Sequence, residues 1–270
     1  MKSFDYHRAA SLTDASAVLK VAPEARLLAG GMTLIPALKL RLATPSALID
    51  LAAISELRGI RTSGGTITVG AMTRHAELER SPQVREAIPA LADLAGMIGD
   101  AQVRNRGTLG GSIANNDPAA DYPAAVLALG ASITTNQRTI AADNFFTGIF
   151  ATALRSGEII TAVSFPVPRA AAYEKFRSPA SRYALVGVFV ARTQTGVRLA
   201  VTGAAPCVFR ATAMETALTE KFAPEALASI RTPSDGLNSD MHADAQYRAH
   251  LIGVLARRAV EGIVDAAAKR

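Results

Sequence analysis

Cysteine, tryptophan and long apolar runs are scarce or missing in this sequence. One cysteine, Cys207, occurs among 270 residues, which excludes an internal disulfide. It also excludes an iron–sulfur cluster held by this chain alone, because such clusters need several thiolates. No apolar run reaches the roughly 18 residues of a membrane span, and the N-terminal segment lacks the compact apolar core of a secretory signal. The sequence therefore predicts a cytoplasmic protein with no membrane span.

Metal-ligand spacing and catalytic constellations are missing as well. The histidines lie far apart, and only His242 and His250 come within about two helical turns of each other. Metal sites bring several imidazoles, thiolates or carboxylates together at short spacings, so we predict no metal site in this chain. No Ser-His-Asp or Cys-His arrangement can be identified either. We therefore assign no catalytic residue.

Positive charge is in excess but is not concentrated in one region. The net charge is +6, yet the lysines and arginines are scattered along the chain and are not interleaved with aromatic residues. Nucleic-acid-binding proteins carry a basic stripe or patch, so we predict no nucleic acid partner. An anionic ligand and an acidic partner surface both stay open.

The length of 270 residues predicts two or three domains. Residues 24–52 have the pattern of a β-α-β unit: the strand EARLLAG, a glycine turn, the helix LIPALKLR and the strand SALIDLA. A hairpin follows around Ser63-Gly64-Gly65. Beyond it the sequence predicts helices in RHAELERS, PQVREAIPALADLAGMIG and YPAAVLALGA, and a second hairpin in SITTNQRTIAA.

The last hundred residues have a different pattern. The strands ALVGVFVART and GVRLAVTGAA predict a hairpin in an antiparallel sheet, and ATAMETALTEKF and PEALASIR predict helices. A long helix is expected at the C-terminus, with Ser239 or Asp240 as its N-cap. Its expected apolar face comprises Tyr247, Leu251, Val254, Leu255 and Ala259.

Two glycine pairs stand out as candidate ligand sites. We call residues 28–34 (LAGGMTL) the first glycine loop and residues 108–112 (TLGGS) the second glycine loop. Glycine permits left-handed backbone and close approach of the main chain, and successive N–H groups in such turns bind anions such as phosphate. Downstream of the second loop, Asn115, Asn116, Asp117 and Asp121 offer partners for ribose or ribityl hydroxyls and for a polar ring edge. Together these features favour one extended ligand that bears phosphate.

Two common phosphate-binding motifs fit the sequence less well. Asp50 follows Gly30 at the distance expected of the ribose-binding acid of a Rossmann fold, but AGGMTLIP lacks the G-x-G-x-x-G fingerprint. That interpretation also gives no role to the stretch after Arg104. The G-x-x-x-x-G-K-[ST] loop of nucleoside triphosphatases does not occur.

The two glycine loops resemble the motifs of a known family. AGGMT (29–33) is similar to the AGG-x-[ST] loop, and QVRNRGTLGGSIANNDPAADYP (102–123) to the T-[IL]-GG loop, of the FAD-binding medium subunits of molybdenum hydroxylases. This family includes the carbon monoxide dehydrogenase and xanthine dehydrogenase types. The stretches YEKFRSPASRYALVGVFVA (173–191) and LNSDMHADAQYRAHLIGVLARRAV (237–260) resemble its C-terminal domain, so the resemblance covers the whole chain.

The resemblance implies an α+β fold in which two α/β subdomains of the PCMH type clamp a non-covalently bound FAD. A C-terminal α+β domain, with an antiparallel sheet and a long terminal helix, would cover the flavin end. The expected domains are residues 1–57, 58–168 and 169–270. The first glycine loop would hold the diphosphate and ribose through backbone amides, and the second would close on the phosphates and the flavin from the other side.

Further contacts with FAD are implied outside the loops. Ile98 and Ile160 would make apolar contacts, Asp121 a polar contact, Arg177 would lie near the flavin, and Tyr183 would shield one face of its ring. The full set of expected FAD-binding residues is Leu28, Ala29, Gly30, Gly31, Met32, Thr33, Leu34, Ile98, Thr108, Leu109, Gly110, Gly111, Ser112, Asn115, Asp117, Asp121, Ile160, Arg177 and Tyr183.

The implied function is electron transfer within an oxidoreductase complex. A large partner subunit with a molybdenum-pterin centre would oxidise the substrate, and a small partner with [2Fe–2S] clusters would pass electrons to the FAD of this chain. The expected assembly is a dimer of heterotrimers, and the final acceptor is an external one such as NAD or a quinone. Two alternatives stay open: a stand-alone flavin-dependent oxidoreductase, and a flavin-binding scaffold module.

Overall fold

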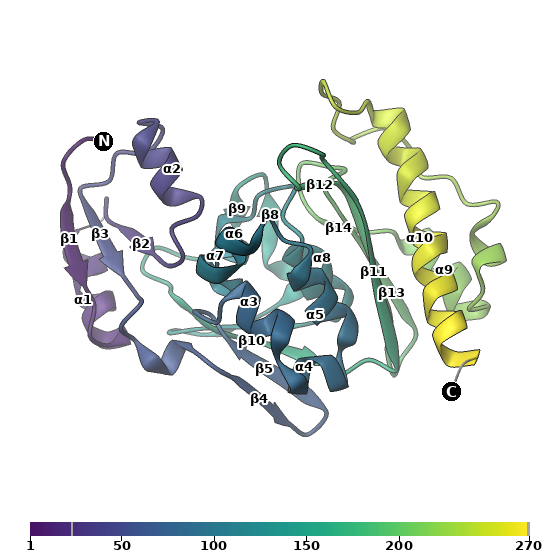
Figure 1. The fold of residues 1–270 in the computed structure, drawn as a ribbon, viewed down its shortest axis with the longest axis horizontal. Helices are drawn as coiled ribbons and strands as arrows, with labels where there is room; N and C mark the ends of the chain where they lie inside the picture. Colours follow the sequence, from purple (N-terminus) through teal and green to yellow (C-terminus); the bar gives the residue numbers. More distant parts are fainter. Residues whose placement is uncertain (23, 269–270) are drawn as a thin grey trace.

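The computed structural model describes residues 1–22 and 24–268, in which three larger sheets follow one another along the chain (Figure 1). The first sheet is parallel, with the strand order β1-β3-β2. Its elements are β1 (Asp5–Arg8), α1 (Leu12–Val21), β2 (Arg26–Leu28), α2 (Leu34–Lys39) and β3 (Ala47–Asp50). The predicted β-α-β unit is confirmed by β2, α2 and β3. β1 and α1 lie outside the predicted elements, because DYHR is short and polar and has no apolar alternation.

The second sheet is antiparallel, with the order β4-β5-β10-β6-β7. The two hairpins predicted for this part of the chain are confirmed by β4-β5 and β6-β7. The strands are β4 (Ile60–Ser63), β5 (Thr66–Gly70), β6 (Ser132–Thr135), β7 (Thr139–Ala141) and β10 (Ile160–Pro166), and a separate small hairpin comprises β8 (Phe146–Gly148) and β9 (Ala151–Thr152). Short 3-10 helices lie at η1 (Ser55–Leu57) and η2 (Ala142–Asn144).

A layer of helices separates the second sheet from the third (Figure 1). One apolar core joins Ile67 and Val163 of the second sheet, Leu91 of this helix layer, and Phe189 of the third sheet. The helices between residues 75 and 128 are α3 (His75–Arg80), α4 (Pro82–Ala87), α5 (Pro89–Gly96), α6 (Ala101–Arg106), α7 (Leu109–Asn115) and α8 (Tyr122–Ala128).

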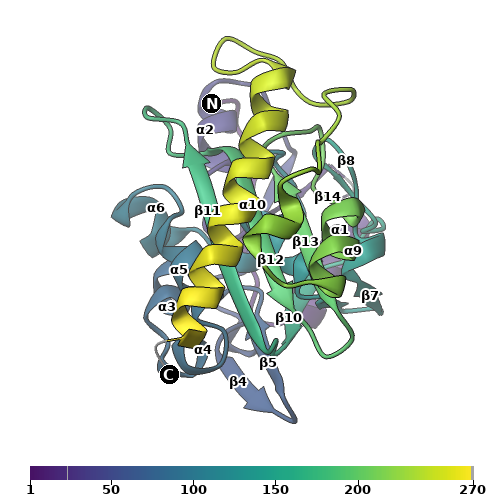
Figure 2. The ribbon, with the colours of Figure 1, turned by 90° about the vertical axis from the view of Figure 1, so that its right-hand side faces the viewer.

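The third sheet is antiparallel and is covered on both faces. It comprises β11 (Ala170–Arg177), β12 (Ala184–Arg192), β13 (Val197–Thr202) and β14 (Phe209–Arg210). In β12, Val186, Val188 and Val190 join one core, while Phe189 and Ala191 join the other, as the two-residue period of a strand requires. The long helix α10 (Ala245–Ala268) lies across the outer face together with α9 (Thr212–Glu220) (Figure 2).

Several predicted helix boundaries are wrong. The single helix expected over residues 82–99 is broken at Ile88, where φ is −140°, because the following Pro89 has no N–H to donate and disfavours a helical residue before it. PEALASIR forms only a short 3-10 helix, η3 (Pro224–Leu227). Asp244, rather than Ser239 or Asp240, accepts a hydrogen bond from Tyr247 N–H at the start of α10.

The buried face of α10 also differs from the expected one. Leu251, Leu255 and Ala259 are buried, but Tyr247 is exposed. Among the helices that the structure describes, none has the length and apolarity to cross a membrane.

Candidate functional site

The first glycine loop connects β2 to α2 and keeps its backbone donors free. Gly31 has a φ of +76°, a left-handed conformation that favours glycine. Ile35 N–H donates to the Gly31 carbonyl, but the N–H groups of residues 30–34 have no hydrogen-bond acceptor among the described residues. Thr33 stands at the start of α2, and its hydroxyl makes no capping bond. This loop therefore has a run of donors that a bound anion can satisfy.

The second glycine loop is built differently, because it forms the first turn of helix α7. The Thr108 hydroxyl caps the helix by accepting from Gly111 N–H at 3.2 Å. Leu109 N–H donates to the Thr73 carbonyl and Gly110 N–H to the Ala71 carbonyl, at 3.1 and 2.8 Å. Most backbone donors of this loop are thus already bound within the protein. Thr108 N–H is an exception, with no acceptor among the described residues.

Gly110 and Gly111 serve close packing rather than a left-handed turn. Neither has a positive φ. A Cβ atom on Gly110 would lie 2.6 Å from the Cβ atom of Ala71, and one on Gly111 would lie 2.9 Å from the Thr108 hydroxyl oxygen and 3.4 Å from the Cβ atom of Ala29. Because these two residues have no side chain, helix α7 packs closely against the end of strand β5 and against the first glycine loop.

The first glycine loop lies against the second glycine loop and against the residues that lead into it. A Cβ atom on Gly30 would lie 2.7 Å from the Cα atom of Gly107 and would overlap the Arg106 carbonyl oxygen. Such distances are shorter than the packing of real Cβ atoms allows, so only glycine fits at position 30 without a shift of the neighbouring backbone. Its backbone lies directly against the residues that lead into the second glycine loop.

A buried histidine packs against Gly107, next to this contact. His75 is 4% exposed, its backbone N–H donates to the Gly107 carbonyl at 3.0 Å, and a Cβ atom on Gly107 would lie 2.5 Å from its Nε2 atom. Burial, with a smaller effect of the nearby Arg104 guanidinium, lowers the pKa of His75 to about 4, so the imidazole is neutral at pH 7.

Two buried polar atoms beside this histidine have no partner. The Nδ1 atom of His75 and the hydroxyl of Tyr122 make no hydrogen bond to the described residues, and the two rings lie 5.2 Å apart. Buried polar groups are nearly always paired. His75 is not among the site residues predicted from the sequence, since a lone histidine at the start of a helix carries no distinguishing signal.

Asp121 lies in a buried network that joins the helix layer to the third sheet. The Tyr173 hydroxyl and the Lys175 ammonium both donate to its carboxylate, with Lys175 Nζ at 2.8 and 2.9 Å from the two oxygens. Burial raises the pKa of the Asp121 carboxyl, and the charge of Lys175 opposes that shift. A direct contact between Asp121 and a ligand stays a prediction.

The turn at residues 97–99 is held by three cations. Lys175 Nζ donates to the Met97 carbonyl at 3.1 Å, Arg104 Nη1 to the Ile98 carbonyl at 3.2 Å, and Arg182 Nη1 to the Gly99 carbonyl at 3.4 Å. Arg104 is itself paired with Glu79 at 3.0 Å. The half-buried Ile98 therefore lies in a turn held by one side chain from α6 and two from the third-sheet region.

A pocket of about 330 Å³ is lined in part by Asp117 and Tyr183. Tyr183 is 45% exposed. Partial burial raises the pKa of its hydroxyl, and the carboxylates of Asp117 and Asp121 add to that shift. Asp117 also accepts from Ala119 N–H at 2.9 Å. The side chain of Asn116 donates to the carbonyls of Gly148 and Ala151 and so holds the β8–β9 hairpin beside this pocket.

The remaining predicted residues lie in different surroundings. Asn115 is half-buried at the end of α7, Ile160 is buried in the apolar core of β10, and Arg177 is exposed at the end of β11. Their contacts with a cofactor stay predictions. Within the described chain, no three His, Cys, Asp or Glu side chains come close enough together to hold a metal ion.

Comparison with known proteins identifies the family. Residues 2–168 match the FAD binding domain in molybdopterin dehydrogenase, and residues 171–263 match the CO dehydrogenase flavoprotein C-terminal domain. The chain belongs to the FAD-binding medium subunits of the molybdenum hydroxylases. It is thus an oxidoreductase subunit that binds FAD.

Relatives and solved structures match this chain along nearly its whole length. The carbon monoxide dehydrogenase medium chain of Hydrogenophaga pseudoflava is 36% identical over 95% of this chain and 96% of its own. The nicotine 6-hydroxylase medium subunit of Paenarthrobacter nicotinovorans is 35% identical over 98% and 97%. The structure of quinoline 2-oxidoreductase from Pseudomonas putida 86 superposes with a TM-score of 0.90 at 31% identity, covering 99% of both chains. The α+β fold predicted from the sequence is confirmed.

The residues present fit an FAD diphosphate. The free N–H groups of the first glycine loop are donors for phosphate oxygens, and the hydroxyl of Thr33 is exposed beside them. Thr108 N–H adds a donor from the second glycine loop, which the Gly30 contact brings alongside. The two loops thus form one surface with unsatisfied donors.

Proposed function

We propose that this chain is the electron-transfer subunit of a multi-subunit molybdenum hydroxylase. It takes electrons from the [2Fe–2S] clusters of a small partner subunit and passes them to an external acceptor, while a large molybdenum-pterin subunit oxidises the substrate. We further propose a cytoplasmic dimer of heterotrimers. Two observations together support the FAD-binding part of this proposal. The two glycine loops lie in contact, and the backbone N–H groups of the first loop have no acceptor among the described residues.

The role of each part of the chain follows from its surroundings. The first glycine loop binds the diphosphate, and the second supplies Thr108 N–H and a close-packed wall. Tyr183, about half exposed beside Asp117, covers one face of the flavin ring. The bound FAD supplies the redox chemistry, since flavins exchange electrons singly or in pairs. The predicted domain limits at residues 57 and 168 stay a proposal, and each of the three larger sheets lies within one of the three segments.

The place of this chain in a complex is supported by its relatives and by its composition. Proteins 35 and 36% identical to it are named medium subunit and medium chain. The single cysteine leaves the chain without thiolates for an iron–sulfur cluster of its own. Electrons from a cluster must therefore come from another subunit.

The test of this function is purification of the chain with its native partners. We expect a yellow complex whose iron and molybdenum co-purify with this chain, and whose flavin absorption bleaches when substrate is added. The isolated chain should bind FAD but should not oxidise the substrate. A chain that binds no FAD would overturn the cofactor assignment, and an isolated chain that turns over substrate alone would overturn the subunit role.

Tyr183 provides a sharper test of the flavin position. In Tyr183→Ala the flavin absorption bands should shift and FAD should bind less tightly, because one ring face loses its aromatic cover. The matched control is Tyr247→Ala, since Tyr247 has nearly the same exposure, 43% against 45%, but lies on α10. Equal spectra for the two variants would contradict the placement of the flavin beside Tyr183.

A further inference from the structure

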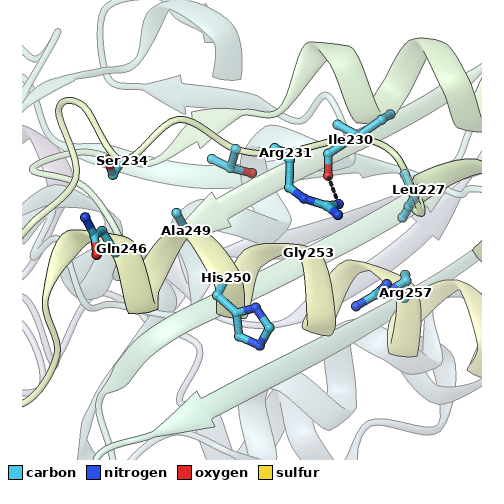
Figure 3. A pocket seen from close by; sticks show the side chains of 10 residues that line it. Leu227, Ile230, Arg231, Ser234, Gln246, Ala249, His250, Gly253 and Arg257 are labelled. Atoms are coloured by element: carbon cyan, nitrogen blue, oxygen red, sulfur yellow. Dashed lines mark hydrogen bonds between the residues drawn. The ribbon is translucent and has the colours of Figure 1, made fainter.

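A second pocket lies far from the glycine loops. It has a volume of about 400 Å³ and lies between α10 and the segment 227–234 (Figure 3). Helix α10 packs on the outer face of the third sheet, whereas the helix layer that includes α7 packs on the inner side of that sheet. This pocket is therefore separate from the proposed FAD site. Its lining residues are Leu227, Ile230, Arg231, Thr232, Ser234, Gln246, Ala249, His250, Gly253 and Arg257.

The charge of this pocket has one sign. Arg231 and Arg257 contribute guanidinium groups, His250 contributes an imidazole, and no Asp or Glu is among the lining residues (Figure 3). Elsewhere in the same part of the chain, Arg210 pairs with Glu215 at 2.6 Å and Arg248 with Asp240 at 2.7 Å. Within the described residues, Arg231 and Arg257 make no ion pair. A cleft lined by one sign of charge concentrates counter-ions.

Arg231 is held in place without being neutralised. Its Nη1 atom donates to the carbonyls of Ala228 and Ile230, at 2.8 and 3.4 Å. Carbonyl oxygens fix the guanidinium but do not cancel its charge, so its other donors stay available. Arg231 is exposed, and these two carbonyls restrict its guanidinium without neutralising it. Its planar fork suits two-pronged binding of a carboxylate or phosphate.

The rest of the lining indicates the chemical class of the ligand. Thr232, Ser234 and Gln246 offer neutral hydrogen-bonding groups, while Leu227 and Ile230 provide apolar surface. The volume lies within the range of roughly 300 to 1,000 Å³ that is usual for small-molecule sites. A Cβ atom on Gly253 would meet nothing within 4 Å, so the helix leaves this part of the pocket open.

We propose that this pocket binds a small organic anion, with its phosphate or carboxylate between Arg231 and Arg257 and its apolar body against Leu227 and Ile230. The site is independent of FAD binding and of the electron-transfer role. It gives the complex a second ligand site on the outer face of the C-terminal sheet.

The test uses the FAD-loaded protein, so that the probes cannot enter an empty FAD site. Calorimetric titrations with inorganic phosphate, AMP and benzoate distinguish a preference for phosphate from one for carboxylate. We expect AMP or benzoate to bind more tightly than inorganic phosphate, because only they fill the apolar part. Arg231→Gln and Arg257→Gln should each weaken binding about tenfold or more, as loss of a charge-assisted hydrogen bond does.

The matched control is Arg258→Gln. Arg258 is exposed, neighbours Arg257 in the sequence and does not line the pocket. Burial raises the pKa of Glu174, and the charge of Arg258 opposes that rise, so Arg258 lies near Glu174. Its replacement should leave binding unchanged. Failure of all three probes to bind at millimolar concentration would overturn the proposal, as would equal effects of Arg257→Gln and Arg258→Gln. Burial of Arg231 and Arg257 against a partner subunit, without any binding of small anions, would also overturn it.

Discussion

The contact between the two glycine loops can be tested by adding one methyl group. Gly30 does not have a positive φ, so alanine at this position strains no backbone angle of its own. Its new Cβ atom, however, would lie 2.7 Å from the Cα atom of Gly107 and would overlap the Arg106 carbonyl oxygen. Two carbon atoms pack at about 3.5 to 4.0 Å, so the loops must separate by about 1 Å.

The separation should weaken FAD binding more than it disturbs the fold. Overpacking of this kind costs about 1–3 kcal/mol, and here the strain falls between the two loops that line the proposed diphosphate site. In Gly30→Ala the Kd for FAD should therefore rise by about tenfold to a hundredfold. The measurement is a fluorescence titration of the FAD-free protein with FAD, alongside far-UV circular dichroism.

The control for this substitution is Gly262→Ala. Gly262 lies in α10, where a Cβ atom would meet nothing within 4 Å. Alanine in a helix is preferred to glycine by up to about 1 kcal/mol, so this variant should be slightly more stable and should bind FAD normally. An unchanged Kd in Gly30→Ala would refute the argument that contact between the loops creates the site.

Two further predictions concern buried ion pairs. Lys175→Met leaves the Asp121 carboxylate without its buried ammonium partner. The free energy of unfolding, measured by urea denaturation, should therefore fall by about 3–5 kcal/mol. A loss below about 1 kcal/mol would contradict the inferred ion pair between Lys175 and Asp121. The Arg138 guanidinium, helped by the Arg155 N–H, lowers the pKa of Glu158 to about 2 from 4.5. The ionised Glu158 therefore stabilises the fold above pH 4.5, and this contribution, on the order of 1–2 kcal/mol after solvent screening, is lost as the pH falls toward 2. Glu158→Gln should flatten the dependence of unfolding free energy on pH in that range, and an unchanged slope would show that Glu158 is not the titrating group.

Local sequence patterns predicted much of the fold. Ser63-Gly64-Gly65 marked the β4–β5 hairpin, because a tight turn between alternating strands has few other solutions. The break at Ile88 was not predicted, because the apolar residues keep a helical period across it. Pro89, which disfavours a helical residue before it, was the signal that could have indicated the break. The four-residue strand β1 had no such signal, because it gains stability from pairing with β3 rather than from its own composition.

The residue types of the candidate site could be predicted from the sequence, but the hydrogen-bonding role of each loop could not. The glycine pairs indicated two close-packed turns that meet. Which backbone donors stay free depends on distant partners, such as the Thr73 and Ala71 carbonyls that bind Leu109 and Gly110. The partners of Asp121 likewise come from a strand that no local pattern links to it.

The core between the second and third sheets has a consequence for how the chain can be divided. Phe189 and Ala200 of the third sheet pack into the same apolar cluster as Leu91 and Ile113 of the helix layer, and Lys175 reaches from the third sheet to the turn at residues 97–99. A fragment that stopped at residue 168 would expose that cluster to water and lose the cation bound to Asp121. We therefore expect the FAD-binding part to need the C-terminal part for stable folding, so the chain is best expressed and engineered as one piece.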